Sequence, residues 1–193
     1  MSRIDAEVWL AGHDADSLWR ILARNRFEGA VAFGDAEHTP ERPWILGVVG
    51  ETNDPRDLDR WQRHSRFRGV RGGIGMASEA ARRGLACDFT VTLEQALNAV
   101  EVHPLLRLAV TLANPELARV PNVMVKIGAG WQRELLEMLG EDRLIFASRW
   151  PLGLPDRTWK QTLASFTQIL GAQSIETREK ILGGNAKRFY GIE

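Results

Sequence analysis

The residues of this sequence that could do chemistry lie at the ends of short apolar runs. Glu7 and Trp9 end the run IDAEVW, Arg71 ends FRGVR, Lys126 lies in NVMVKIG, and Arg149 follows LIFAS. A carboxylate can accept a proton, whereas arginine and lysine side chains bind carboxylates and phosphates. Arginine stays protonated at any ordinary pH and cannot be a general base. These residue types predict an anion-binding site in which Glu7 is the candidate for proton transfer.

Alternating strand and helix patterns must position these residues. Apolar or β-branched runs predict strands near Arg3–Leu10, Gly29–Phe33, Trp44–Val49, Gly69–Ile74, Ala86–Thr92, Leu106–Leu112, Asn122–Ile127 and Leu144–Ser148. Helical patterns lie near Asp16–Asn25, Pro55–His64, Met76–Arg83, Leu93–Val102, Trp131–Leu139, Arg157–Leu170 and Ile175–Phe189. Expected helix caps are Asp16, Asp54, Asp156 and Gly171, and a helix break is expected at Gly183-Gly184.

This alternation implies parallel strands joined by crossovers, and eight such strands would close into a (β/α)8 TIM barrel. The alternative is an open doubly wound sheet. With 193 residues the chain is short for a barrel, and the shortfall lies at residues 34–43 and 113–121. Neither segment has room for a good crossover helix. We therefore expect a compact barrel with an incomplete outer helix ring, whose exposed strand faces could mediate homo-oligomerisation.

The composition is that of a globular protein, and we expect one domain over residues 1–193. Lys+Arg and Asp+Glu both number 25, so no net field favours nucleic acid or an anionic membrane. Cys87 is the only cysteine, which excludes an internal disulfide and fits a reducing compartment. The first residues carry no signal-peptide pattern, and no apolar run is long enough to span a membrane. These features predict a cytoplasmic protein.

Several strand motifs and the tail, in this order, resemble the amidohydrolase-related lactonase and decarboxylase family, known as amidohydrolase family 2. The motifs are IDAEVW (4–9), FRGVR (67–71), LACDF (85–89), LRLAVTLANP (106–115), NVMVKIGAG (122–130), RLIFASRWP (143–151) and GGNAKRFYG (183–191). The resemblance implies a TIM barrel that hydrolyses a lactone or cleaves a C–C bond in a small organic acid. It also implies that the arginine of the fourth strand holds a substrate carboxylate.

The positions that carry the family's chemistry differ in this chain. Glu7 and Trp9 replace the two histidines of the first strand, Thr111 replaces the histidine of the sixth, and Arg149 replaces the aspartate of the eighth. Zinc needs imidazole, thiolate or carboxylate ligands, usually three from the protein at a catalytic site. Only Glu7 could supply one, so we expect no metal and no other cofactor.

If the family's inward positions are kept, nine side chains point into the barrel: Asp5, Glu7, Trp9, Arg71, Asp88, Thr90, Thr111, Lys126 and Arg149. We expect Glu7 and Arg149 to form an ion pair, because the first and eighth strands are neighbours in a closed barrel. The Trp9 indole would fill the volume that the metal site vacates. One interpretation is that all these charges merely satisfy one another.

Three functions follow from this pattern and stay open. The first is a hydrolase of small carboxylated lactones or related acids that has lost the metal-dependent mechanism. In it Glu7 and Arg149 are the catalytic positions, and the substrate-binding positions are Arg71, Lys126, Trp9 and Thr111. The second is an inactive barrel that binds a small anion or a protein partner. The third is a trimmed scaffold kept for its fold alone.

Overall fold

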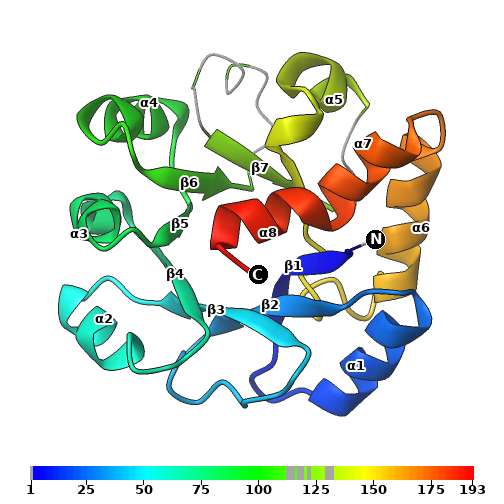
Figure 1. Ribbon diagram of the computed structural model, residues 1–193, viewed down its shortest axis with the longest axis horizontal. Coiled ribbons are helices and arrows are strands. Elements are labelled where there is room, and N and C mark those ends of the chain that lie inside the picture. Colours follow the sequence, from blue (N-terminus) through cyan, green and yellow to red (C-terminus); the bar gives the residue numbers. More distant parts are fainter. Residues whose placement is uncertain (1, 112–115, 117–119, 121–122, 129–132) are drawn as a thin grey trace.

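The chain forms a ring of eight parallel strands with helices around it (Figure 1). This computed structural model describes residues 2–111, 116, 120, 123–128 and 133–193. The strands follow the chain order: β1 Ile4–Trp9, β2 Gly29–Gly34, β3 Ile45–Glu51, β4 Phe67–Gly72, β5 Ala86–Phe89, β6 Arg107–Val110, β7 Val123–Ile127 and β8 Leu144–Phe146. A parallel bridge between Val8 and Trp150 joins β1 to the segment after β8. The predicted barrel is confirmed, and the open doubly wound sheet is wrong.

The helices lie outside the ring except at the end of the chain. Those between strands are α1 Ala15–Arg24, α2 Pro55–Trp61, α3 Ala77–Arg82, α4 Leu93–Val102 and α5 Glu134–Leu139, with short 3-10 turns at Ile74–Met76 and Glu141–Arg143. After β8 come α6 Trp159–Leu170, α7 Ile175–Glu179, a π-helical turn at Lys180–Gly184 and α8 Asn185–Tyr190. In the described residues no helix is long and apolar enough to cross a membrane.

The outer helix ring is incomplete next to β2, as predicted. Residues 35–44 connect β2 to β3 without a helix. In place of a helix, the Trp44 indole stacks on Trp19 of α1 with ring centroids 5.9 Å apart. The second expected gap, at residues 113–121, falls almost wholly outside the described residues.

Two apolar clusters follow from the alternation of side chains along each strand. The outer cluster lies between strands and helices and includes Cys87, which faces the helices as expected. The inner cluster fills the barrel with residues such as Val31, Phe33 and Ile145. Three residues of α8 also belong to it: Ala186, Phe189 and Tyr190. The helix therefore closes the end of the barrel at which the strands begin.

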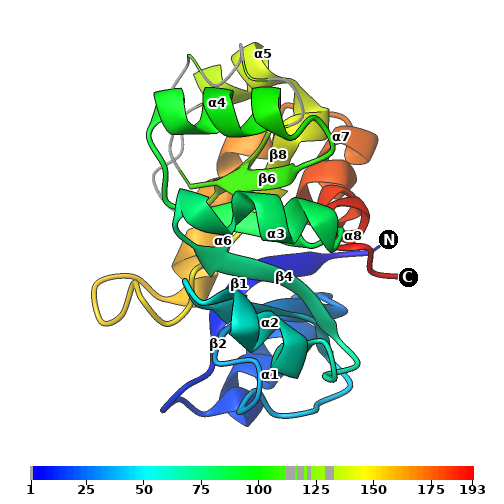
Figure 2. The ribbon, with the colours of Figure 1, turned by 90° about the vertical axis from the view of Figure 1, so that its left-hand side faces the viewer.

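The two ends of the barrel differ in what covers them. Figure 2 shows α8 and both chain termini at one end, and the loop between β8 and α6 projecting from the other. The loop leaves the barrel at the carboxyl ends of the strands, which is the end where TIM-barrel enzymes place their active sites. We call this end the mouth, and the end under α8 the base.

Candidate functional site

Five charged side chains from five parts of the chain meet at the mouth. We call them the charge cluster: Glu7 of β1, Arg71 of β4, Asp88 of β5, Lys126 of β7, and Arg149 just after β8. Each lies at or near the carboxyl end of its strand. Parallel strands in a closed ring bring these ends together although the residues are far apart in sequence.

Glu7 is the centre of the cluster, and its side chain is fully buried. Its Oε1 accepts a hydrogen bond from Arg71 Nη1 at 3.1 Å, and its Oε2 accepts one from Lys126 Nζ at 3.1 Å. Arg149 Nε lies 3.5 Å from Oε1, so the predicted ion pair with Arg149 is present. The Trp9 indole also donates to Oε1, at 3.2 Å. The carboxylate thus has three cations and one neutral donor around it.

A β-bulge in β1 determines which acid enters the barrel. Asp5 pairs with Ala30 of β2, but Val8 pairs with Ala32, so β1 has one extra residue between these pairs. Before the bulge, Asp5 faces outward. Its Oδ2 accepts a hydrogen bond from the Trp159 indole of α6 at 2.7 Å. The prediction that Asp5 points inward is therefore wrong, because a bulge shifts the alternation of side chains.

Lys126 and Asp88 complete the buried part of the cluster. The Lys126 ammonium contacts both Asp88 Oδ2 and Glu7, and neither the lysine nor Glu7 is exposed. It also lies 3.9 Å from the centre of the Phe33 ring, as expected for a cation–π contact. Arg71 Nη1 lies 3.5 Å from Asp88 Oδ1. Each buried charge therefore has an opposite charge in contact with it.

The two buried acids titrate in opposite directions. Burial raises the pKa of Glu7, but Lys126, Arg71 and Arg149 outweigh it and hold the pKa below its ordinary value. Burial, together with the nearby Glu7 charge, keeps the pKa of Asp88 above its ordinary value in spite of Lys126. Burial lowers the pKa of Lys126, but its two acidic partners raise it overall. Glu7 is therefore a carboxylate and Lys126 an ammonium at neutral pH.

Two cations of the cluster reach solvent. The Arg71 side chain is 16% exposed and the Arg149 side chain is 46% exposed, whereas Glu7, Lys126 and Asp88 are at most 3% exposed. The Arg71 guanidinium also lies 5.2 Å from the centre of the Trp9 ring. Glu51 at the end of β3 is 54% exposed and lies 3.9 Å from Arg71 Nε. With it, three acids balance three bases, and the accessible groups are the two guanidinium groups and this carboxylate.

The structure places the other predicted residues as follows. Trp9 contacts Glu7 of the charge cluster, and the centres of the Trp9 and Phe33 rings lie 5.8 Å apart. Thr111 is exposed one residue beyond β6, and among the described residues no hydrogen bond or ion pair joins it to the cluster. Thr90 is likewise exposed, beyond β5. Sequence reasoning missed Phe33, although its position in the alternating run GAVAF indicates an inward side chain.

A metal ion does not fit the residues present. Where the resemblance implies two histidines, a third histidine and an aspartate, this chain has one carboxylate, and both of its oxygens accept from cationic groups. Over the described ranges, no group of three or more His, Cys, Asp or Glu side chains is placed to hold a metal ion. The cluster has the charge balance of an ion-pair network and lacks the donor set of a zinc centre.

Comparisons with known proteins agree with the fold and with the sequence motifs. Residues 107–192 match the sequence model of the Amidohydrolase family. No curated protein sequence matches the chain. Among solved structures, an amidohydrolase from Burkholderia multivorans with bound zinc has a TM-score of 0.79 and 18% identity, with 100% of both chains covered.

Two further solved structures superpose on the whole chain. One, from Pseudomonas putida, is provisionally described as a 2-pyrone-4,6-dicarboxylic acid hydrolase; it has a TM-score of 0.71 and 15% identity, with 97% of its own chain covered. The other is the 5-carboxyvanillate decarboxylase of Sphingomonas paucimobilis, with a TM-score of 0.70, 11% identity and 99% of its own chain covered. At these identities the likeness shows the fold. The chain is therefore a (β/α)8 barrel, and residues 107–192 of it resemble the Amidohydrolase family.

Proposed function

We propose that the mouth of this barrel binds a small organic anion, with Arg71 and Arg149 holding its carboxylate. One observation carries the proposal. Glu7, Asp88 and Lys126 contact one another out of solvent, while solvent reaches the guanidinium groups of Arg71 and Arg149. In the described part of the chain, Arg149 pairs with no carboxylate other than Glu7, which Arg71 and Lys126 share. A guanidinium group binds a carboxylate with two parallel hydrogen bonds, which makes arginine suited to this task.

The relatives support a carboxylated ligand. Two of the solved structures of this fold are named for a dicarboxylic acid and for a carboxyvanillate. Both names describe a planar ring that carries carboxylate groups. The Trp9 indole beside Arg71 would give such a ring an aromatic surface to pack against. Lys126 would not touch the ligand, because its ammonium is fully buried between Glu7 and Asp88. Its role would be to hold these two carboxylates in place.

Hydrolysis of a lactone is the second candidate, and the family match supports it. It would require Glu7 or Asp88 to transfer a proton. Glu7 is a poor base because three cations lower its pKa and its side chain is buried. Asp88 has a raised pKa but contacts Lys126 and is 3% exposed. Binding without turnover therefore agrees better with the geometry. Location in the cytoplasm and self-association stay predictions.

Calorimetric titration of the protein with isophthalate, a planar dicarboxylate, tests the proposal. Arg149→Gln should weaken binding at least tenfold, since a charged hydrogen bond contributes about 1.5–3 kcal/mol. Arg157→Gln is the matched control, because Arg157 is an exposed arginine of the same loop. The neutral analogue isophthalamide should not bind. Equal affinity of the wild type and Arg149→Gln would refute the proposal, and release of product from a lactone probe would favour the hydrolase.

A further inference from the structure

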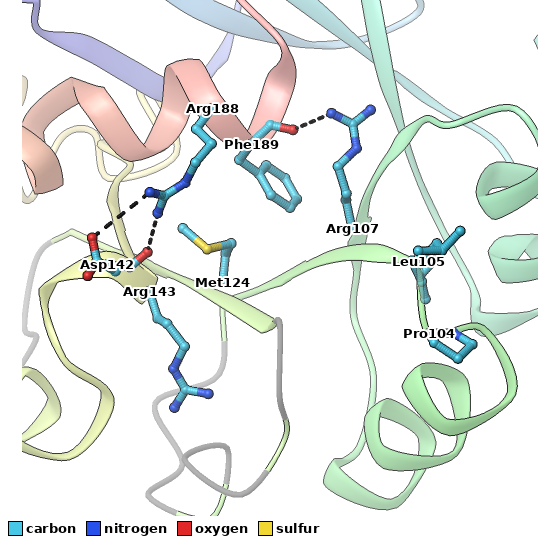
Figure 3. Close-up of a pocket in the computed structure, with 9 residues that line it drawn as sticks. Pro104, Leu105, Arg107, Met124, Asp142, Arg143, Arg188 and Phe189 are labelled. Atoms are coloured by element: carbon cyan, nitrogen blue, oxygen red, sulfur yellow. Dashed lines mark hydrogen bonds and ion pairs between the residues drawn. The ribbon is translucent and has the colours of Figure 1, made fainter.

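A second pocket lies at the base of the barrel, at the opposite end from the charge cluster. It has a volume of about 440 Å³ and lies between the start of β6, the start of β7, the turn at Glu141–Arg143, and α8. Figure 3 shows Arg188 and Phe189 reaching from α8 on one side, Arg107 on the other, and Met124 between them. The volume falls within the range of about 300–1,000 Å³ that is typical of small-molecule sites.

The floor of this base pocket is apolar. Leu106, Met124 and Phe189 line it, and their side chains are between 2% and 8% exposed. Leu105 lies on the rim and is 91% exposed. The floor and the rim together offer a hydrophobic surface that a planar apolar group could cover.

Arg107 is the main charge of the pocket, and no carboxylate among the described residues pairs with it. Its Nη1 donates to the carbonyl of Phe189 at 2.9 Å, and its Nη2 contacts the carbonyl of Gly84. These two contacts fix the guanidinium at the wall of the pocket. Burial lowers the pKa of this guanidinium, as expected for a partly buried cation without a counter-ion.

Arg188 is the second cation of the pocket, and its acid is shared. Arg188 Nη1 lies 3.9 Å from Asp142 Oδ1, and Lys180 Nζ lies 3.5 Å from the same oxygen. Arg188 also donates to the main-chain oxygen of Asp142 at 2.9 Å (Figure 3). Arg143 lines the pocket too, but its side chain points away from Met124. Lys180 also contacts Glu141 at 2.6 Å and does not line the pocket. Arg107 and Arg188 thus face the pocket with one carboxylate, Asp142, which leaves the pocket positive.

We propose that the base pocket is a binding site for a small aromatic carboxylate. The carboxylate would lie between Arg107 and Arg188, and the ring would cover Met124, Phe189 and Leu105. Charge and shape both favour this ligand class: the cations are on the wall, and the floor has no polar side chain to orient a sugar or a nucleotide. This site shares no residue with the mouth, so the two proposals stand or fall separately.

Binding of 2-naphthoate, followed by NMR of a protein labelled with carbon-13 in the methionine methyl groups, tests this site. The Met124 signal should shift with a saturable dependence on ligand. Met76 and Met138 lie elsewhere in the described structure and should not shift. A Met124→Leu variant assigns the signal. The neutral analogue 2-naphthamide should bind at least tenfold more weakly, because it lacks the charge that Arg107 and Arg188 require.

Two substitutions on the rim of the pocket distinguish specific binding at this site from nonspecific binding elsewhere on the protein. Arg188→Gln and Leu105→Asp should each weaken naphthoate binding at least tenfold, and both of these side chains are mostly exposed. Leu152→Asp, at an exposed leucine of the mouth loop, is the matched control and should bind like the wild type. Arg149→Gln should also leave this affinity unchanged. An unshifted Met124 signal, or a loss of binding in Arg149→Gln alone, would overturn the proposal.

Discussion

The ammonium of Lys126 lies 3.1 Å from the carboxylate of Glu7, although 119 residues separate them in the chain and neither side chain is exposed. Taking two charges out of water is expensive, and contact between them offsets that cost only when both are present. The pair therefore ties β7 to β1 across the barrel, and the stability of the fold depends on both members.

Removal of either partner should destabilise the protein strongly. We expect Glu7→Gln and Lys126→Met each to lower the free energy of unfolding by about 3 kcal/mol, the low end of the usual cost of breaking a buried pair. The cost is at the low end because Asp88 still contacts Lys126 and Arg71 still contacts Glu7. The free energy of unfolding of the double variant should fall by less than the sum of the two single losses. Urea unfolding of the four proteins gives the coupling energy. Additive losses would show that the two groups do not interact.

The coupling between Glu7 and Arg149 should be smaller. Arg149 Nε lies 3.5 Å from the carboxylate and its side chain is 46% exposed, so water screens the pair. Exposed pairs typically contribute less than about 1 kcal/mol. Urea unfolding of the wild type, Glu7→Gln, Arg149→Gln and the double variant measures this coupling energy. A coupling as large as that between Glu7 and Lys126 would mean that Arg149 is a structural member of the cluster.

Because Asp5 is buried, we expect the free energy of unfolding to fall as the pH rises from about 4 to about 6. Burial raises its pKa to about 6, although hydrogen bonds from Ser148, Trp159 and Glu7 lower it. Since the folded state holds this proton more tightly than the unfolded state, the protonated acid stabilises the fold by up to about 3 kcal/mol. That contribution is complete below pH 4 and lost above pH 6. Unfolding measured from pH 4 to 8 should show it in the wild type and not in Asp5→Asn.

Two adjacent glycines should respond differently to alanine. A Cβ on Gly183 would clash with the main chain of Ser2 and Arg3, whereas one on Gly184 would meet nothing closer than 3.7 Å. We expect Gly183→Ala to lower the free energy of unfolding by about 1–3 kcal/mol, the usual cost of overpacking. Gly184→Ala should be neutral or stabilising. Thermal unfolding compares them, and equal melting temperatures would contradict the close packing of the π-helical turn on Ser2 and Arg3.

Asn185 should not tolerate a carboxylate. Its Nδ2 donates to the carbonyls of Glu141 at 2.7 Å and Leu144 at 2.8 Å, and the residue is 1% exposed. Asn185→Asp keeps the shape but replaces the donor with an acceptor that faces two acceptors. We expect a loss of several kcal/mol at pH 7 and partial recovery at low pH, where the acid is protonated. Urea midpoints at pH 7 and pH 4 test this, and a midpoint that does not change with pH would contradict it.

The barrel and most of the cluster could be predicted from the sequence. The order of the strands and the alternation of side chains place Arg71, Asp88 and Lys126 inside, and the closure of the ring places Glu7 beside Arg149. The bulge that turns Asp5 outward could not be predicted, because it depends on backbone register and leaves no mark in the residue types. The sequence named Arg149 as a specific partner of Glu7, whereas the contacts of Glu7 with Arg71 and Lys126 depend on how far each side chain reaches across the barrel.

Helix ends show where sequence signals were misread. Asp54 and Gly171 are caps as predicted, but Asp14 caps α1 in place of Asp16, and Thr158 caps α6 in place of Asp156. Thr158 forms a capping box with Gln161, a pattern that the sequence TWKQ displays. The glycine pair at Gly183-Gly184 does not end its helix. A π-helical turn carries the chain through both residues into α8.

The position of α8 has a consequence for how the chain folds. Each strand pairs with the next along the chain, so most of the ring can assemble from local contacts, which form rapidly. The first strand, however, must wait for partners from the other end of the sequence, namely the segment after β8 and the helix that covers the base. Closure of the ring is therefore the step of highest contact order, because it joins the two ends of the chain.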